Sequence, residues 1–392
     1  VASNDTSPCS STINRCCGDD ALPSVQRDAG ALSSACAPVP VSNGAHTVLP
    51  RTGSTRPVGR RWSAGSVDCP QGNGAALNPA GIISVLRRSQ DWQLTASLEI
   101  YVSRMKAIRE NDTEHRQRAI HLLSVAVNHL FPTAVVLEAG SGPVGLHLAA
   151  PISDLDVVVL DGSDGRGGLA RLYEHLTRDS AFSDVVYLSR ASTPVVKMTL
   201  SGTMLSVDIT WNAPYVAESL IFLLESIREH AMFGPIVMYV KYYLYMYGLG
   251  TPYHGGVGSF LLYLLVKSHL QVNHEACASS TGTCLRSFFE YYGYGFDVLR
   301  TCISVVRGGR LFNKRDRVHR GLFDPSALCV ENPFDSATDV GRSAFNFAAV
   351  RRAFYWTSLH LTRSWKVDLT RVTPPKPVHP GPPSRLRHPS FA

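Results

Sequence analysis

The stretch LEAGSGPVGLHLAAPISDLDVVVL, residues 137–160, determines the predicted fold. It ends in Leu155–Leu160, an apolar, β-branched run typical of a buried strand. Asp154 and Asp156 stand at the start of this run. Because alternate side chains of a strand point to the same face, we expect the two carboxylates to converge. A shorter strand, predicted over 134–138, leads into Gly140-Ser141, where the backbone can approach a phosphate closely and the serine hydroxyl can bind it.

A third carboxylate is predicted on a hairpin about fifty residues further on, where 195–200 and 203–210 flank the turn signal Ser201-Gly202. In the second arm, Asp208 shares one face with Ser206 and Thr210, and the other face is apolar. If this arm pairs beside Leu155–Leu160, three carboxylates meet and repel one another unless cations lie between them. Mg²⁺ suits such a site, and Mn²⁺ is the alternative ion.

An isolated Asp-x-Asp also occurs in structural turns and at solvated strand edges. Gly-Ser, a short spacer, Asp-Leu-Asp and a third aspartate on a strand form a more specific combination.

The composition is compatible with a nucleic-acid partner. The 392 residues carry a net charge of +7 and 44% hydrophobic residues, although many proteins with no such partner share a modest basic excess. The nine cysteines form no paired C-x-x-C set, so their spacing predicts no zinc site, and an odd count without a secretory signal indicates reduced thiols. We expect no membrane segment, since the most apolar stretches are short and contain Lys241 and Lys267.

Periodicity divides the chain into two ordered parts between two tails. Residues 1–75 and the Pro-rich basic tail 366–392 are expected to be disordered. Helices are predicted over 115–131, 169–178, 219–230, 236–247, 257–272 and 344–362. A small α/β unit is therefore followed by a mostly helical one. The basic run Arg307–Arg320 is either a solvated loop or a track for an RNA backbone.

Four ordered blocks carry a resemblance to known proteins. The aspartate pattern resembles the DNA-polymerase-β-like nucleotidyltransferase superfamily. HLFPTAVVLEAGS (129–141), YHGGVGSF (253–260) and NPFDSATDVGRSAFNF (332–347) are similar to blocks of TRAMP-type non-canonical poly(A) polymerases. The resemblance implies an α+β fold with two lobes. A nucleotidyltransferase catalytic domain with a mixed β-sheet would span 118–212, and a mostly helical central (PAP-associated) domain would combine 85–117 with 213–365. The nucleotide would lie in the cleft between them.

Residue roles follow from the same resemblance. Asp154, Asp156 and Asp208 would hold the metals, and Asp208 would accept the proton of the attacking hydroxyl. The nucleotide contacts would come from Gly140, Ser141, Lys241, Ser259, Phe260, Asp335 and Thr338. Other interpretations remain open. Lys241 can snorkel, Phe260 can be a core residue, and Thr338 can cap a turn. Tyr245 stands where the family has a second lysine.

The implied reaction is template-independent transfer of AMP from ATP to an RNA 3′ end by two-metal-ion catalysis. Uridylyl-adding relatives place a histidine at the position of Thr338, so ATP is expected over UTP. The alternatives are a terminal uridylyltransferase and an inactive nucleotidyltransferase that serves as an RNA-binding scaffold. Because no RNA-recognition module is visible, a separate zinc-knuckle RNA-binding protein and a helicase are the partners that the family implies. The family implies a nuclear location. An organelle matrix is the alternative, since the chain begins at Val1.

Overall fold

The computed structural model describes residues 79–162, 165–316 and 327–363, all of which lie in one compact unit of the chain. The disorder expected for 1–75 and the basic tail expected for 366–392 fall outside the described residues. Within the described part the protein is the α+β fold that the sequence predicts. A sheet-containing lobe and a mostly helical lobe each have their own core.

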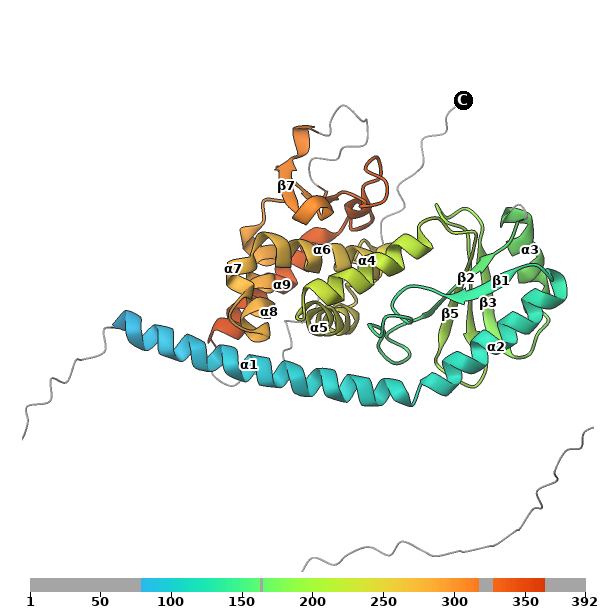
Figure 1. The fold of residues 1–392 in the computed structure, drawn as a ribbon, viewed down its shortest axis with the longest axis horizontal. Coiled ribbons are helices and arrows are strands. Elements are labelled where there is room, and N and C mark those ends of the chain that lie inside the picture. The colour runs from blue at the N-terminus through green and yellow to red at the C-terminus, as the bar shows by residue number, and fades with distance from the viewer. Residues whose placement is uncertain (1–78, 163–164, 317–326, 364–392) are drawn as a thin grey trace, which may run out of the picture. The chain divides into compact units, whose positions relative to one another are not determined.

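The first lobe is built on a mixed sheet (Figure 1). In the part of the chain that the structure describes, its strands lie in the order β1 (Val135–Glu138), β2 (Leu155–Leu160), β5 (Ser206–Trp211), β4 (Val195–Leu200) and β3 (Phe182–Leu188). β2 and β5 are parallel, whereas β1–β2, β5–β4 and β4–β3 are antiparallel. The parallel pairing of β2 with β5 is the arrangement on which the predicted carboxylate cluster depends.

Helices α2 (Thr113–Leu130) and α3 (Gly165–Leu176) pack on the apolar face of this sheet. Leu123 and Val127 of α2 and Leu172 of α3 are fully buried there with Val157 and Ile209. Alternation along the strands sends their polar side chains to the opposite face, because successive residues of a strand point in opposite directions. That face is left for the functional residues.

The second lobe contains most of the helices. They are α1 (Pro79–Glu110), α4 (Val216–Glu229), α5 (Phe233–Met246), α6 (Ser259–Val272), α7 (His274–Cys277), α8 (Thr281–Glu290) and α9 (Phe347–Arg363). Short helical turns lie at Pro252–His254, Tyr291–Gly295, Val306–Gly308 and Val340–Ser343. A small sheet, in the order β7 (Arg310–Asn313), β6 (Thr301–Ser304) and β8 (Cys329–Val330), completes the lobe within the described residues. Buried aromatic rings dominate its core, among them Tyr239, Phe288 and Phe354.

Helix α1 was not predicted, although it is the longest helix that the structure describes, with 32 residues. Leu94, Leu98 and Tyr101 are buried in the core of the helical lobe, while Trp92 and Ile100 are exposed. Because apolar residues occur on more than one side of the helix, its periodicity is blurred. None of the described helices combines the length and apolar character needed to cross a membrane.

Candidate active site

The three predicted aspartates lie on the polar face of the five-stranded sheet. Asp156 of β2 and Asp208 of β5 are direct partners in the parallel register. Asp154 precedes β2 by one residue and therefore shares the face of Asp156. Asp156 and Asp208 are half-buried, and Asp154 is exposed. The fold thus brings together carboxylates that are separated by more than fifty residues.

The electrostatics of this cluster favour a bound cation. Burial, followed by the charge of Asp208, raises the pKa of Asp156 to about 6. The same two causes raise the pKa of Asp154. A divalent cation removes the repulsion and replaces the lost water, so the donor set fits Mg²⁺, which prefers carboxylate oxygens.

Lys197 is a residue of this face that the sequence reasoning missed. It lies on β4 as the direct partner of Asp208, and its ammonium forms an ion pair with that carboxylate. The pattern of β4 contained the signal, since Val196 and Met198 are buried and Lys197 must then point to the polar face. Lys197 therefore places a positive charge at the edge of the carboxylate cluster.

The turn after β1 approaches the carboxylates closely. Gly140 adopts a left-handed conformation with φ +66°, and a Cβ atom there would lie 2.3 Å from Oδ2 of Asp156. Only glycine meets both conditions without displacing the carboxylate. The next residue, Ser141, is buried, with 2% of its surface exposed.

Lys241 of α5 reaches across to this turn from the helical lobe. Its Nζ donates a hydrogen bond to Oγ of Ser141 at 3.3 Å. Burial lowers the pKa of Lys241 to about 8, while Asp156 and Asp154 act in the opposite direction. Lys241 therefore does not snorkel toward solvent, which was the competing interpretation. It presents an ammonium group beside Ser141.

Tyr263 of α6 is a second residue that the sequence did not reveal. Its side chain is buried, and its hydroxyl lies next to the hydroxyls of Ser141 and Ser259. It forms no hydrogen bond of normal geometry with a described residue. Burial raises the pKa of this phenol, so it stays protonated and can donate to a ligand oxygen. Periodicity alone marks Tyr263 as a core residue.

The loop between β1 and β2 lies in a positive field. Burial first, then the charges of Arg116, Arg109 and Lys241, lower the pKa of His147 to about 3. Arg116 is buried and donates to Oε1 of Glu138 at 3.0 Å. This concentration of positive charge beside Gly140-Ser141 suits a polyphosphate ligand.

Aromatic rings gather next to the predicted nucleotide residues. Phe260, the second residue of α6, is stacked on Phe334 with ring centroids 6.0 Å apart. Phe334 is in turn stacked on Tyr215 at 5.7 Å. Phe260 also packs against the helical core, so its packing role is observed. Ser259 is exposed at the start of α6.

Asp335 and Thr338 interact with each other. The Thr338 hydroxyl donates to Oδ2 of Asp335, and the other carboxylate oxygen accepts from the backbone of Ala337 at 3.0 Å. Thr338 therefore stabilises the preceding turn 335–338, whereas the following turn, which the alternative interpretation assigned to Thr338, is capped by Asp339. Its exposed side chain remains accessible to a ligand.

The remaining candidates are distributed more widely. Tyr245 is 43% exposed. Within the basic run, Lys314 is buried and donates to the backbone oxygen of Ala327, so it does not track an RNA backbone. Arg310 and Arg315 are exposed, and residues 317–320 lie outside the described part.

Two known families match parts of this chain. The family described as "Poly(A) RNA polymerase, mitochondrial-like, central palm domain" matches residues 98–219, and the family described as "Cid1 family poly A polymerase" matches residues 280–338. The first match covers the sheet with its three aspartates, and the second ends in the segment that contains Asp335 and Thr338.

Curated relatives match most of the described chain. The chain is 30% identical over 281 residues to the inactive non-canonical poly(A) RNA polymerase protein Trf4-2 of Drosophila melanogaster, covering 68% of this chain and 69% of that protein. It is 26% identical over 275 residues to poly(A) RNA polymerase protein 2 of Saccharomyces cerevisiae, covering 67% of this chain and 46% of that protein. The chain thus spans about half the length of the yeast relative.

Solved structures share the fold. The polymerase core of TRAMP, an RNA surveillance complex, aligns with a TM-score of 0.63 at 24% identity over 71% of this chain and 93% of that chain. Cid1 poly(U) polymerase with Mg 3′-dATP bound aligns with a TM-score of 0.60 at 22% identity over 69% of this chain and 95% of that chain. At these identities the likeness establishes the fold.

Proposed function

We propose a function from the premise that this chain belongs to the non-canonical poly(A) RNA polymerase family, which its match to the Drosophila relative over two thirds of both chains shows. The proposed activity is template-independent addition of AMP from ATP to RNA 3′ ends. The RNA 3′-hydroxyl oxygen would attack the α-phosphate of ATP, forming a phosphodiester bond and releasing pyrophosphate.

The observation that carries the proposal is the register of Asp156 with Asp208, with Asp154 on the same face. These carboxylates would hold Mg²⁺, which when bound acidifies the attacking hydroxyl and offsets charge on the leaving oxygen. Asp208 would accept the proton of the 3′-hydroxyl. Mn²⁺ would fit the same oxygen ligands.

The remaining contacts would hold the nucleotide. Lys241 and Ser141, already 3.3 Å apart, would bind the triphosphate, and Ser259 would add a hydroxyl. Phe260 would stack on the base, with Asp335 and Thr338 near its edge. The bound triphosphate would lie in the positive field of Arg116, Arg109 and Lys241 beside His147.

The test is single-nucleotide extension of a labelled oligoribonucleotide with Mg²⁺ and each nucleoside triphosphate supplied separately. We expect extension with ATP, and faster incorporation than with UTP. Asp154→Ala and Asp156→Ala should abolish it, because each removes a metal ligand. Glu174→Gln is the matched control, since this exposed carboxylate lies on α3 of the same lobe. Faster incorporation of UMP would establish a uridylyltransferase instead.

One relative in this family is described as inactive, so the scaffold alternative needs its own outcome. Three carboxylates with two raised pKa values are unfavourable unless a cation is bound. A protein without catalysis gains nothing from them, which favours the enzyme. RNA binding without extension by any nucleotide, in Mg²⁺ and in Mn²⁺, would establish the scaffold.

Partners and location follow by family analogy. We propose that a separate zinc-knuckle RNA-binding protein supplies RNA affinity, that a helicase acts with the pair, and that the complex works in the nucleus. Adding such an RNA-binding subunit should increase extension by this chain. Processive tailing by the isolated chain would contradict the partner, and fluorescence microscopy of the tagged protein would test the location.

A further inference from the structure

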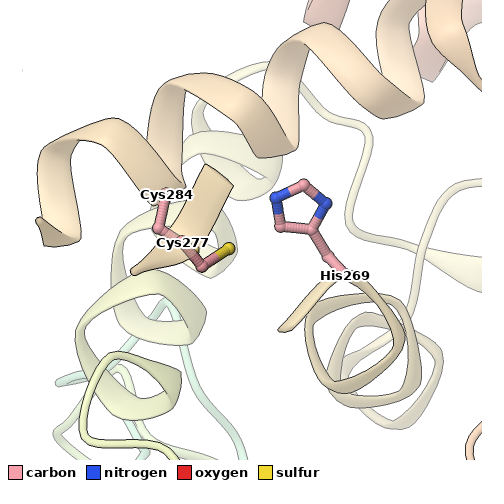
Figure 2. A group of neighbouring side chains, drawn as sticks. All are labelled: His269, Cys277 and Cys284. Atoms are coloured by element: carbon pink, nitrogen blue, oxygen red, sulfur yellow. The ribbon is translucent and has the colours of Figure 1, made fainter. Parts of the chain in front are cut away.

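Three successive helices bring a histidine and two cysteines together in the core of the helical lobe (Figure 2). His269 lies near the end of α6, Cys277 ends α7, and Cys284 lies within α8. One ligand atom from each side chain lies within 4.8 Å of the other two. All three residues are buried, with exposed fractions of 1%, 6% and 0% respectively.

The orientation of His269 is already fixed by polar neighbours. Its Nε2 lies 2.7 Å from Oγ of Ser287, and its Nδ1 lies 3.1 Å from the side-chain amide of Asn273. The Ser287 hydroxyl also donates to the backbone oxygen of Cys284 at 3.1 Å, so it accepts from Nε2–H when no metal is bound. With Nε2 bound to a metal, Nδ1 would carry the proton. The Asn273 amide, turned over, would then accept it through Oδ1.

Aromatic rings pack around the imidazole of this cluster. The His269 ring lies 5.6 Å from the ring of Phe288 and 5.7 Å from that of Tyr291. Two thiolates and a neutral imidazole would offset the charge of one divalent cation, so the bound set would be neutral overall. A neutral set is the kind of polar group that an apolar core can enclose.

We propose that His269, Cys277 and Cys284 form a structural zinc site that fastens α6, α7 and α8 together. Zinc is four-coordinate and tetrahedral with sulfur and nitrogen ligands, and two sulfur atoms bound to it lie about 3.8 Å apart, so these three side chains would fill three of the four positions. The cluster therefore needs to contract by about 1 Å from its outer limit of 4.8 Å. Both thiol protons leave to solvent on binding, and the Ser287 hydroxyl stands beside the fourth position, where it can hydrogen-bond a bound water molecule.

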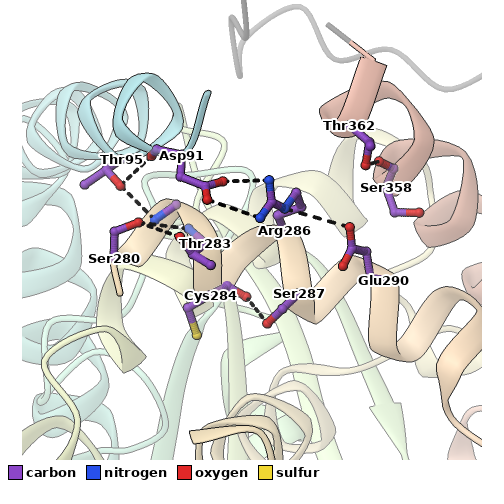
Figure 3. Close-up of polar contacts among 11 residues, drawn as sticks. Asp91, Thr95, Ser280, Thr283, Cys284, Arg286, Ser287, Glu290, Ser358 and Thr362 are labelled. Carbon is purple, nitrogen blue, oxygen red and sulfur yellow. Dashed lines mark hydrogen bonds and ion pairs between the residues drawn. The ribbon is translucent and has the colours of Figure 1, made fainter. Parts of the chain in front are cut away.

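The frame around the cluster is rigid enough to support such a site. Arg286 of α8 forms an ion pair with Asp91 of α1 at 2.7 Å, and Ser280 caps α8 by accepting from the backbone of Thr283 at 3.1 Å (Figure 3). These contacts fix the positions of Cys284 and Ser287. α7 has only four residues, so Cys277 is the ligand best able to move inward.

The proposal is tested on the full chain by elemental analysis and cobalt substitution. Purified protein should retain about one zinc ion per chain, and Co²⁺ in its place should give the intense visible bands of a tetrahedral site with a thiolate charge-transfer band. Cys277→Ser and Cys284→Ser should each lose the ion and both signals. Cys329→Ser is the matched control, because Cys329 is buried in the same lobe but lies opposite Cys302 in the small sheet. It should keep the ion.

Stability provides a readout that does not depend on the variants folding well. Removing zinc from the wild-type chain with a thiol-based chelator should lower its melting temperature by several degrees, and zinc alone should restore it. Metal that persists in Cys277→Ser would be held at another place in the chain and would overturn the proposal. A metal-free chain with a disulfide between Cys277 and Cys284 would overturn it as well. None of these readouts uses nucleotidyl transfer, so they stand apart from the proposed activity.

Discussion

Replacing Gly140 with alanine should disable the carboxylate cluster without removing any of its members. The new Cβ would lie 2.3 Å from Oδ2 of Asp156, and ordinary contact begins at 3.4 Å. The β2 backbone is fixed by pairing on both sides, so the Asp156 carboxylate must move by about 1 Å. A misplacement of this size costs about a hundredfold in rate, or about 2.7 kcal/mol of transition-state free energy.

The backbone conformation adds a separate effect on stability. Alanine at a left-handed position costs about 1–2 kcal/mol of folding free energy. Gly202→Ala is the matched control, because Gly202 has φ +78° and a Cβ there would meet no atom within 4 Å. Both variants should lose similar stability in thermal unfolding.

The assay is single-turnover AMP addition to a labelled oligoribonucleotide with saturating ATP. Gly140→Ala should be about a hundredfold slower than wild type, and Gly202→Ala should be within about twofold. If Gly140→Ala extends RNA within about threefold of Gly202→Ala, the close approach of this turn to Asp156 has no catalytic importance, and the reasoning fails.

Three further predictions concern the same site. Because the folded pKa of Asp156 is raised from 3.8 to about 6, its stabilising contribution is present below pH 3.8 and is lost as pH rises through about 6. Without Mg²⁺, the free energy of unfolding of Asp156→Asn should therefore rise relative to that of wild type between about pH 4 and 6, by on the order of 3 kcal/mol at most. Urea titrations would measure this difference, and a difference that does not change with pH would contradict the prediction. Lys241→Met should lower kcat/KM for ATP about tenfold to a hundredfold, since a charged hydrogen bond is worth about 1.5–3 kcal/mol. The control Lys106→Met, which changes an exposed lysine, should leave kcat/KM unchanged, and equal kcat/KM values in the two variants would show that Lys241 does not bind the nucleotide. The wild type should prefer ATP over UTP by tens- to hundreds-fold, and Thr338→His should shift the ratio of AMP to UMP incorporation toward UMP by at least about tenfold in a competition assay. An unchanged ratio would show that Thr338 stabilises its turn and does not select the nucleotide.

The sequence by itself determined four of the five strands that the structure describes in the main sheet, their faces and the candidate metal ligands, whereas β3 and the small sheet were not predicted. The β-branched run after Asp154 predicted β2 with the bounds that the structure has. Alternation along the strand placed Asp208 on the face opposite to that of Val207 and Ile209, which are fully buried. These conclusions were accessible because side-chain periodicity is a local property, read within a single strand or helix.

Tertiary structure alone decided which elements became neighbours. The register of Asp156 with Asp208, the ion pair of Lys197 and the contact between Lys241 and Ser141 join residues far apart in sequence. Helix α1 escaped prediction because its apolar residues occur on several sides, and only packing selects the buried one.

The cysteines show the same limit. Their spacing predicted no zinc site, yet packing of three helices brings Cys277 and Cys284 to His269. A local pattern specifies the face on which a side chain lies, whereas the partner across that face depends on how whole elements pack. Packing is a property of the complete core, which no single window of sequence contains.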